Sequence, residues 1–209
     1  DQQAYSPTFN SFAGRLAQDL VARHSLTGKT VVDVGCSKGD FLALMCDAGC
    51  ALGIGIAPSV VEGRVAPPQN GHLELIQALY QDGHTDIATS LISNRHTLEH
   101  IFDVGDMLRR MHQHAVKADN AVVFIEVPCM ARVLRDCTFE DIYYEHCTYF
   151  TPGALARALR HAGYGVRRLW QDYDAQYLLA EAVTDPNLGR RFEIEESASD
   201  VGALVAIFR

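Results

Sequence analysis

Three side chains suited to proton transfer lie within one short stretch of the sequence, at Tyr143, Glu145 and His146. A carbon nucleophile is made by removing a proton next to a carbonyl group, and histidine is the natural base near neutral pH. A neighbouring glutamate can orient the ring or raise its basicity, and a tyrosine hydroxyl can donate to the developing enolate oxygen. We therefore expect His146 to act as the base, with Glu145 and Tyr143 assisting. The alternative is a capped, hydrogen-bonded aromatic loop without catalytic function.

A glycine turn follows the apolar strand that ends at Val34, and a helix begins after it. Glycine lets the backbone approach a ligand closely and tolerates positive φ, and a helix N-terminus favours a negative group such as a carboxylate. The two glycines are four residues apart, which breaks the dinucleotide fingerprint GxGxxG and weakens a nicotinamide-dependent dehydrogenase as an interpretation. We expect a cofactor to bind this turn, through Asp33, Gly35, Cys36, Ser37 and Gly39. The alternative is a structural turn of the kind that any α/β protein can contain.

The turn resembles the first motif of class I S-adenosylmethionine-dependent methyltransferases, D/E-x-G-x-G-x-G, with Ser37 in place of the middle glycine. The resemblance implies S-adenosyl-L-methionine as the cofactor. In that family the second strand ends in an acid that holds the ribose hydroxyls, whereas Ala57 stands at the matching position here. Another group such as Ser59 takes over that bond, or binding is weak or lost. The predicted cofactor-binding set also includes Ala57, Gln77, Asn94 and Arg95.

Residues 142–151 resemble the I-Y-x-E-H-x-x-Y-F-S/T segment of sugar C-methyltransferases, which methylate a carbon of keto-deoxysugar nucleotides. Residues 94–101 resemble the family's L-E-H segment, where Glu99 and His100 either cap a helix start or take part in chemistry. The resemblance spans residues 5–183. It implies C-methylation of a small acceptor, such as a sugar nucleotide or a keto compound, with Tyr143, Glu145 and His146 as the catalytic trio. Residues 173–178 do not match the family's H-G-G-S-like segment, and the family's cysteine-rich zinc-binding domain is not in this sequence.

Two other functions stay open beside C-methylation. An O- or N-methyltransferase would use the same cofactor, with His146 deprotonating a hydroxyl group. A methyltransferase-like module that binds a ligand or partner without catalysis is motivated by Ala57.

Apolar patterning predicts strands that alternate with helices, and therefore an α/β fold with a doubly wound, mostly parallel, seven-stranded Rossmann-like sheet. The link between the last two strands is short, which predicts an antiparallel last strand. Strands are expected at residues 30–34, 51–56, 73–76, 86–93, 121–127, 166–171 and 177–183, and helices at 8–24, 40–48, 104–116 and 152–162, with a short helix after 57–59.

The predicted domain organisation has three parts. Residues 1–29 form an N-terminal helical segment, in which Tyr5, Phe9 and Phe12 either cover the active site as a lid or simply pack the helix. Residues 30–185 form the S-adenosylmethionine-binding domain. Residues 186–209 form a C-terminal linker and helix that leads into a further domain.

Composition excludes several classes of partner. The 209 residues carry a net charge of −8 without a run of lysine or arginine, so we expect no nucleic-acid partner. No apolar run approaches the about 20 residues that span a bilayer, and no signal peptide is evident, so we expect no membrane partner. The six cysteines form no CxxC pair and no zinc-site spacing, so we expect reduced thiols, no metal and a cytoplasmic protein. The sequence leaves the oligomeric state open.

Overall fold

The computed structural model describes residues 6–61 and 63–208. The chain divides into two compact units. The first runs to Asn94 and takes in His114–Val122, and the second comprises Arg95–Gln113 and the chain from Val123 onwards. Within the described residues, no helix is both long and apolar enough to cross a membrane.

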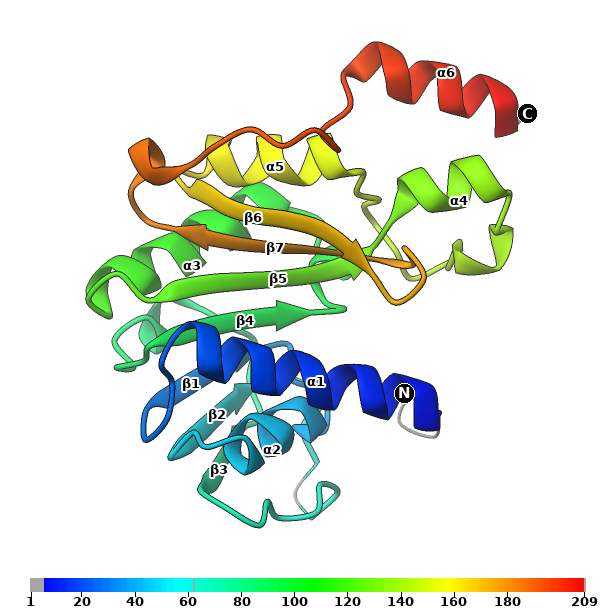
Figure 1. Ribbon diagram of the computed structural model, residues 1–209. Coiled ribbons are helices and arrows are strands. Elements are labelled where there is room, and N and C mark those ends of the chain that lie inside the picture. Colours follow the sequence, from blue (N-terminus) through cyan, green and yellow to red (C-terminus); the bar gives the residue numbers. More distant parts are fainter. Residues whose placement is uncertain (1–5, 62, 209) are drawn as a thin grey trace. The chain divides into compact units, whose positions relative to one another are not determined.

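Helices and strands alternate along the chain (Figure 1). In chain order the structure contains α1 (Pro7–Arg23), β1 (Thr30–Val34), α2 (Asp40–Asp47), β2 (Leu52–Ile56), β3 (His72–Ile76), η2 (Asp82–His84), β4 (Leu91–Arg95), η3 (Leu98–His100), α3 (Val104–Lys117), β5 (Val122–Pro128), α4 (Met130–Asp136), η4 (Phe139–Asp141), α5 (Pro152–His161), β6 (Gly165–Asp172), β7 (Tyr177–Val183), η5 (Pro186–Leu188) and α6 (Ala198–Phe208), where η marks a 3-10 helix.

The sheet has the strand order β3-β2-β1-β4-β5-β7-β6. In the first unit, β1 pairs in parallel with both β2 and β4, and β2 pairs in parallel with β3. In the second unit, β7 pairs antiparallel with both β5 and β6. The predicted fold, a mostly parallel seven-stranded Rossmann-like sheet with an antiparallel last strand, is confirmed.

Local sequence explains where the two capped helices begin. Ser6 caps α1, because its side chain accepts a hydrogen bond from the backbone N–H of Phe9, and Pro7 occupies the first helical position. Thr151 and Pro152 start α5 in the same way. The apolar face of α1 is buried, with Phe12 only 3% exposed, which favours packing over a lid for this helix. Tyr5 lies outside the described residues.

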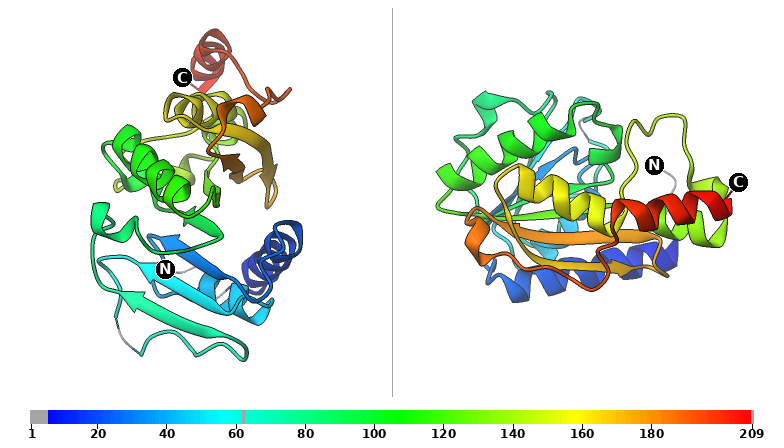
Figure 2. Two further views of the ribbon diagram at one scale, coloured as in Figure 1. Left: turned by 90° about the vertical axis from the view of Figure 1, so that its left-hand side faces the viewer. Right: turned by 90° about the horizontal axis from the view of Figure 1, so that it is seen from above.

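Within the second unit, the segment after the sheet folds back on the helices. Figure 2 shows α6 beside α4, and α5 lies against β6. Glu196, just before α6, binds the start of α5: its carboxylate accepts hydrogen bonds from the Thr151 hydroxyl and from the Gly153 N–H. The expected C-terminal linker therefore docks on this unit before the expected helix begins.

Two local predictions are wrong, and one helix of the structure is not predicted. Between β2 and β3 the described residues contain no helix, because Pro58, Gly63 and the pair at 67–68 interrupt the backbone pattern. The fourth strand begins at Leu91 rather than at residue 86, because residues 82–90 form a 3-10 turn and an irregular connection. Helix α4 is not predicted, because it has only seven residues, which are too few to show a helical apolar periodicity.

Candidate active site

The glycine turn of the first unit needs left-handed backbone at alternate residues. Gly35, Ser37 and Gly39 have φ of 85°, 52° and 92°. The turn is closed by the Gly39 N–H, which donates to the Cys36 carbonyl across 2.8 Å. A Cβ at Gly39 would also lie 3.1 Å from the Leu75 side chain. Glycine at both ends is therefore required by the backbone, and Ser37 occupies a conformation that costs a side chain about 1–2 kcal/mol.

Two hydrogen bonds join the ends of β1 and β4. The Ser93 hydroxyl donates to Asp33 Oδ1 across 2.7 Å, and the Asn94 Nδ2 donates to the Val34 carbonyl across 2.9 Å. Asn94 is fully buried, and its Oδ1 has no hydrogen-bond partner among the described residues. Because a buried oxygen without a partner is costly, Asn94 presents an acceptor that a bound ligand would satisfy.

Cys36 lies in the turn but is not a nucleophile. Burial, aided by the nearby Asp33 charge, raises the pKa of the Cys36 thiol to about 12. A Cβ at Gly55 in β2 would lie 2.6 Å from the Cys36 sulfur. Cys36 therefore packs against a glycine of the neighbouring strand, and its contribution to a ligand is through the backbone.

The end of β2 carries no acid. The Ala57 side chain is 3% exposed, and the Ala57 N–H donates to the Ile76 carbonyl. Ser59 and Gln77 are exposed polar residues nearby in the chain. The residues of the turn fit a cofactor that carries a carboxylate and an amino group, and the end of β2 offers a buried methyl group where the resemblance predicts a ribose-binding acid.

In the second unit, Arg95 forms a buried two-point ion pair with Glu126. Arg95 Nε and Nη2 lie 2.8 Å and 2.9 Å from the two carboxylate oxygens. His96 Nε2 lies 2.7 Å from the same carboxylate, and the His96 ring stands edge-on to Tyr177. Burial opposes ionisation of Glu126, but the charges of Arg95 and His96 outweigh it and lower its pKa to about 2. The Arg95 guanidinium is therefore already bound within the protein, and its predicted cofactor role stays a prediction.

His146 lies in an aromatic and imidazole cluster of the second unit. Its ring centroid is 4.8 Å from that of His100, 5.1 Å from that of Tyr143 and 5.7 Å from that of Tyr149. The ring is half-buried, and its Nδ1 is buried without a hydrogen-bond partner among the described residues. Burial, followed by the nearby His100, lowers the pKa of His146. A neutral ring with a buried nitrogen that no other described residue uses is able to accept a proton.

Backbone hydrogen bonds fix the segment that carries His146. The Glu99 carbonyl accepts from the N–H groups of Cys147 and Thr148, at 2.8 Å and 3.0 Å. The Glu145 carbonyl lies 3.1 Å from His100 Nδ1, and the Tyr149 hydroxyl donates to the Tyr143 carbonyl. The 3-10 turn η3 and the loop are thus held as one piece.

The predicted trio is only partly assembled by these contacts. The Tyr143 ring approaches His146, but the exposed Glu145 side chain makes no hydrogen bond to the His146 ring in the structure. Glu99 is the buried carboxylate beside the cluster: its side chain is 2% exposed, and burial raises its pKa. The sequence leaves Glu99 and His100 between capping and chemistry, and His96 and Glu126 are not among the predicted site residues. The signal for Glu126 was available, since a charged residue stands inside an otherwise apolar strand.

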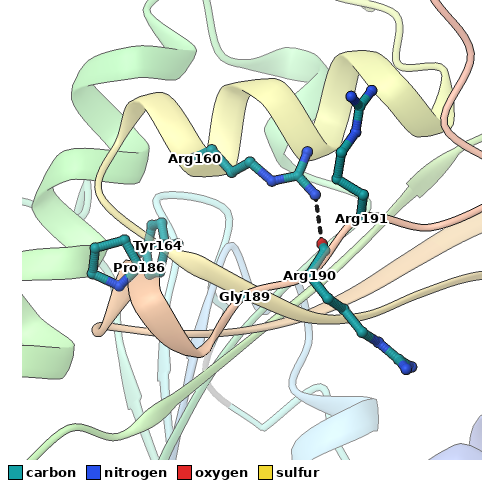
Figure 3. A pocket seen from close by; sticks show the side chains of 6 residues that line it. All are labelled: Arg160, Tyr164, Pro186, Gly189, Arg190 and Arg191. Atoms are coloured by element: carbon teal, nitrogen blue, oxygen red, sulfur yellow. Dashed lines mark hydrogen bonds between the residues drawn. The ribbon is translucent and has the colours of Figure 1, made fainter.

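The second unit also contains a cavity of about 410 Å³, shown in Figure 3. Arg160 points across it to the Arg190 carbonyl, and its guanidinium also binds both Glu195 carboxylate oxygens at 2.7 Å. The cavity lies where β6 begins and β7 has ended, whereas β5 ends beside the opposite end of β7. It is therefore separate from the His146 cluster.

A profile of the methyltransferase domain family matches residues 9–169. The chain belongs to the methyltransferase domain family. At the level of family and fold, this confirms the predicted class I S-adenosylmethionine-dependent methyltransferase and its cofactor.

Individual relatives agree with that assignment. The C-methyltransferase NovU of Streptomyces niveus is 30% identical over 156 residues, which cover 71% of this chain and 36% of NovU. This methyltransferase domain thus spans about a third of that relative.

Two solved structures share the fold. Magnesium protoporphyrin IX methyltransferase of Synechocystis PCC 6803, crystallised with S-adenosylhomocysteine, has a TM-score of 0.58 at 15% identity and covers 83% of this chain and 82% of its own. The 1,6-didemethyltoxoflavin N1-methyltransferase of Burkholderia thailandensis, also with S-adenosylhomocysteine, has a TM-score of 0.57 at 17% identity, with coverages of 83% and 78%.

Proposed function

We propose that this domain methylates a carbon atom of a small keto acceptor, with His146 as the general base and S-adenosyl-L-methionine as the methyl donor. The observation that carries the proposal is the His146 ring, which is half-buried beside Tyr143 and keeps a buried nitrogen without a partner among the described residues. The name of the relative NovU, a C-methyltransferase, supports a carbon acceptor. A sugar nucleotide agrees with the resemblance of residues 142–151.

The chemistry divides between the two predicted sets of residues. In the second unit, His146 removes the proton next to the acceptor carbonyl, and the Tyr143 hydroxyl donates to the enolate oxygen that forms. The resulting carbon nucleophile would take up the methyl group of the bound donor as the carbon–sulfur bond breaks, and His146 then returns its proton to water. When bound, S-adenosylmethionine supplies that methyl group on a positively charged sulfur, which leaves as a neutral thioether.

Cofactor binding is proposed for the turn and strand ends of the first unit. The backbone of Gly35–Gly39 would hold the methionine portion, and Asn94 Oδ1 would accept a hydrogen bond from its amino group. The remaining predicted contacts of this unit are Asp33, Ala57 and Gln77, and Arg95 of the second unit completes the predicted set. The Asp33 carboxylate is held in place by Ser93, so it is already oriented before a ligand arrives.

A second candidate function is a binding module without catalysis, favoured by the buried methyl group of Ala57 at the position of the ribose-binding acid. Titration calorimetry with S-adenosylmethionine, S-adenosylhomocysteine and NAD separates the candidates at the first step. The proposal expects binding of the first two and not of NAD. Absence of binding by both methionine derivatives would remove the enzyme proposal for this domain.

The base is tested with keto-deoxysugar nucleotides in heavy water, using S-adenosylhomocysteine in place of the methyl donor. We expect His146-dependent exchange of the proton next to the carbonyl, detected by NMR. The variant His146→Ala should slow exchange by about 100-fold or more. The matched control His161→Ala removes an exposed histidine of α5 and should leave exchange unchanged. Equal exchange in both variants would show that His146 is not the base.

A further inference from the structure

Glu99, His100 and His146 bring three metal-binding atoms together in the second unit. One side-chain atom from each residue lies within 4.8 Å of the other two. Two come from η3 and one from the loop that η3 holds through the Glu99 carbonyl. The spacing in sequence, 99, 100 and 146, resembles no zinc motif, so only the fold reveals the group. We propose that these three side chains bind one divalent transition-metal ion.

The tautomer of His100 is set for coordination. His100 Nδ1 lies 3.1 Å from the Glu145 carbonyl, which can only accept a hydrogen bond, so Nδ1 carries the proton. The lone pair of the neutral ring is therefore on Nε2. Histidine ligands of protein metal sites commonly donate their other ring N–H to a carbonyl in this way, which fixes the ring.

The Glu99 and His146 side chains each carry a buried polar atom that lacks the partner such atoms normally have. Glu99 Oε2 is buried without a hydrogen-bond partner among the described residues, and the whole residue is 2% exposed. His146 Nδ1 is likewise buried without a partner. Because an unsatisfied buried carboxylate oxygen is costly, a cation between these side chains would stabilise the arrangement.

The donor set selects the class of ion. Two imidazoles and one carboxylate suit Zn²⁺ and other first-row transition ions, whereas Mg²⁺ and Ca²⁺ prefer oxygen ligands. Bonds of about 2.0–2.1 Å in a tetrahedral site place ligand atoms about 3.4 Å apart, so atoms that lie up to 4.8 Å apart must close by about 1.4 Å at most. The exposed His100 ring and the half-buried His146 ring can make that movement. A fourth position remains for water or an acceptor oxygen.

Metal binding and the base role exclude each other, a consequence that rests on the proposed function. A neutral imidazole has one lone pair in the plane of its ring. When that pair is bonded to a metal ion, His146 has none left to accept a proton. The ion would therefore inhibit proton abstraction rather than assist it.

The metal site itself is tested without acceptor or methyl donor, so its outcome is independent of the proposed function. Protein dialysed against a chelator is titrated with Zn²⁺ by calorimetry, with Mg²⁺ as the comparison ion, and with Co²⁺ followed by visible absorption. We expect one Zn²⁺ per chain, no Mg²⁺ binding and a Co²⁺ ligand-field spectrum. Loss of an outer-shell partner alone typically weakens a metal site by about 10- to 100-fold, so Glu99→Gln and His100→Ala should each weaken Zn²⁺ binding at least that much.

Matched controls separate this site from other ligands. His161→Ala and Cys147→Ser, the second at an exposed thiol next to the cluster, should bind Zn²⁺ as the unchanged protein does. Thermal melting verifies that each variant is folded. If Glu99→Gln does not fold, His100→Ala, at an exposed residue, still tests the site. Absence of Zn²⁺ binding, or binding that survives His100→Ala, would overturn the proposal. Inhibition of proton exchange by Zn²⁺ would then support the inference that metal binding and the base role of His146 exclude each other. Exchange that continues at saturating Zn²⁺ would refute that inference.

Discussion

Arg95 and Glu126 form a two-point ion pair at the end of β5, with both carboxylate oxygens within 2.9 Å of a guanidinium nitrogen. The Glu126 side chain is fully buried and that of Arg95 is 8% exposed. Removing one partner leaves a buried charge without compensation, so Glu126→Gln should lower the free energy of unfolding by about 3–5 kcal/mol. Urea denaturation at neutral pH measures this. Asp86→Asn, which removes an exposed pair with Lys117, should shift the midpoint far less, and equal shifts would contradict the prediction.

The same pair predicts a pH dependence of stability. The pKa of Glu126 falls from an ordinary 4.5 to about 2 in the folded protein, so the unfolded chain takes up the proton first as pH falls. The stabilising contribution is full above pH 4.5 and is lost between there and pH 2. Denaturation curves across this range should show the difference between the unchanged protein and Glu126→Gln shrinking as pH falls. A constant difference would mean that the charge of Glu126 is not responsible.

The left-handed backbone of Ser37 predicts a stabilising substitution. Ser37→Gly removes the steric cost of φ 52° and should raise the free energy of unfolding by about 1 kcal/mol. Ser25 has the same φ of 52° in the loop after α1, so Ser25→Gly is a matched control for the backbone effect. Both variants should gain stability, measured by thermal denaturation. Only Ser37→Gly, within the predicted cofactor turn, should also change S-adenosylmethionine binding. A loss of stability in both variants would contradict the prediction that the left-handed backbone of these serines is strained.

Ala57 predicts a gain of affinity. Hydrogen bonds to a charged acceptor are worth about 1.5–3 kcal/mol, so Ala57→Asp should tighten S-adenosylmethionine binding by about tenfold or more. Because the side chain is 3% exposed, the unliganded variant should also melt at a lower temperature. Ala57→Asn, of the same size without the charge, should gain less. Calorimetry that finds no gain with the aspartate would remove Ala57 from the predicted ribose contacts.

Two adjacent tyrosines offer a matched test of the enolate donor. Tyr143 has its ring 5.1 Å from the His146 ring, whereas the Tyr144 side chain is fully exposed. Tyr143→Phe should reduce methyl transfer by about 100-fold through kcat, since the hydroxyl is needed when the enolate forms. Tyr144→Phe should leave kcat unchanged. If the two variants turn over equally, Tyr143 has no donor role.

Strand positions were predictable because buried parallel strands are short, continuous apolar runs. The stretch at β1 is read correctly for this reason, and the hairpin of β6 and β7 is read correctly because only a short link joins its two strands. The start of β4 is predicted too early, at residue 86, because Asp86 and Ile87 continue the predicted strand pattern. In the structure these two residues are instead bound by side chains of α3. The Lys117 side chain lies 2.8 Å from Asp86, and the Ile87 carbonyl lies 2.8 Å from His114 Nε2. Those partners are 27 to 31 residues away in sequence.

The glycine turn is a local feature, and the sequence by itself determined it: the order of Asp33, Gly35 and Gly39 after an apolar strand predicts the left-handed backbone that the structure has. The nearness of Tyr143 to His146 is also local, because they are three positions apart in the sequence. The pairing of Glu126 with Arg95 and His96, and the approach of Glu99 and His100 to His146, were decided only by the tertiary structure. These contacts join residues 30 to 47 positions apart. No local pattern encodes them, because the Glu126 contacts arise when β4 and β5 become neighbours in the sheet, and the His146 contacts arise when η3 and the loop after β5 are hydrogen-bonded to each other.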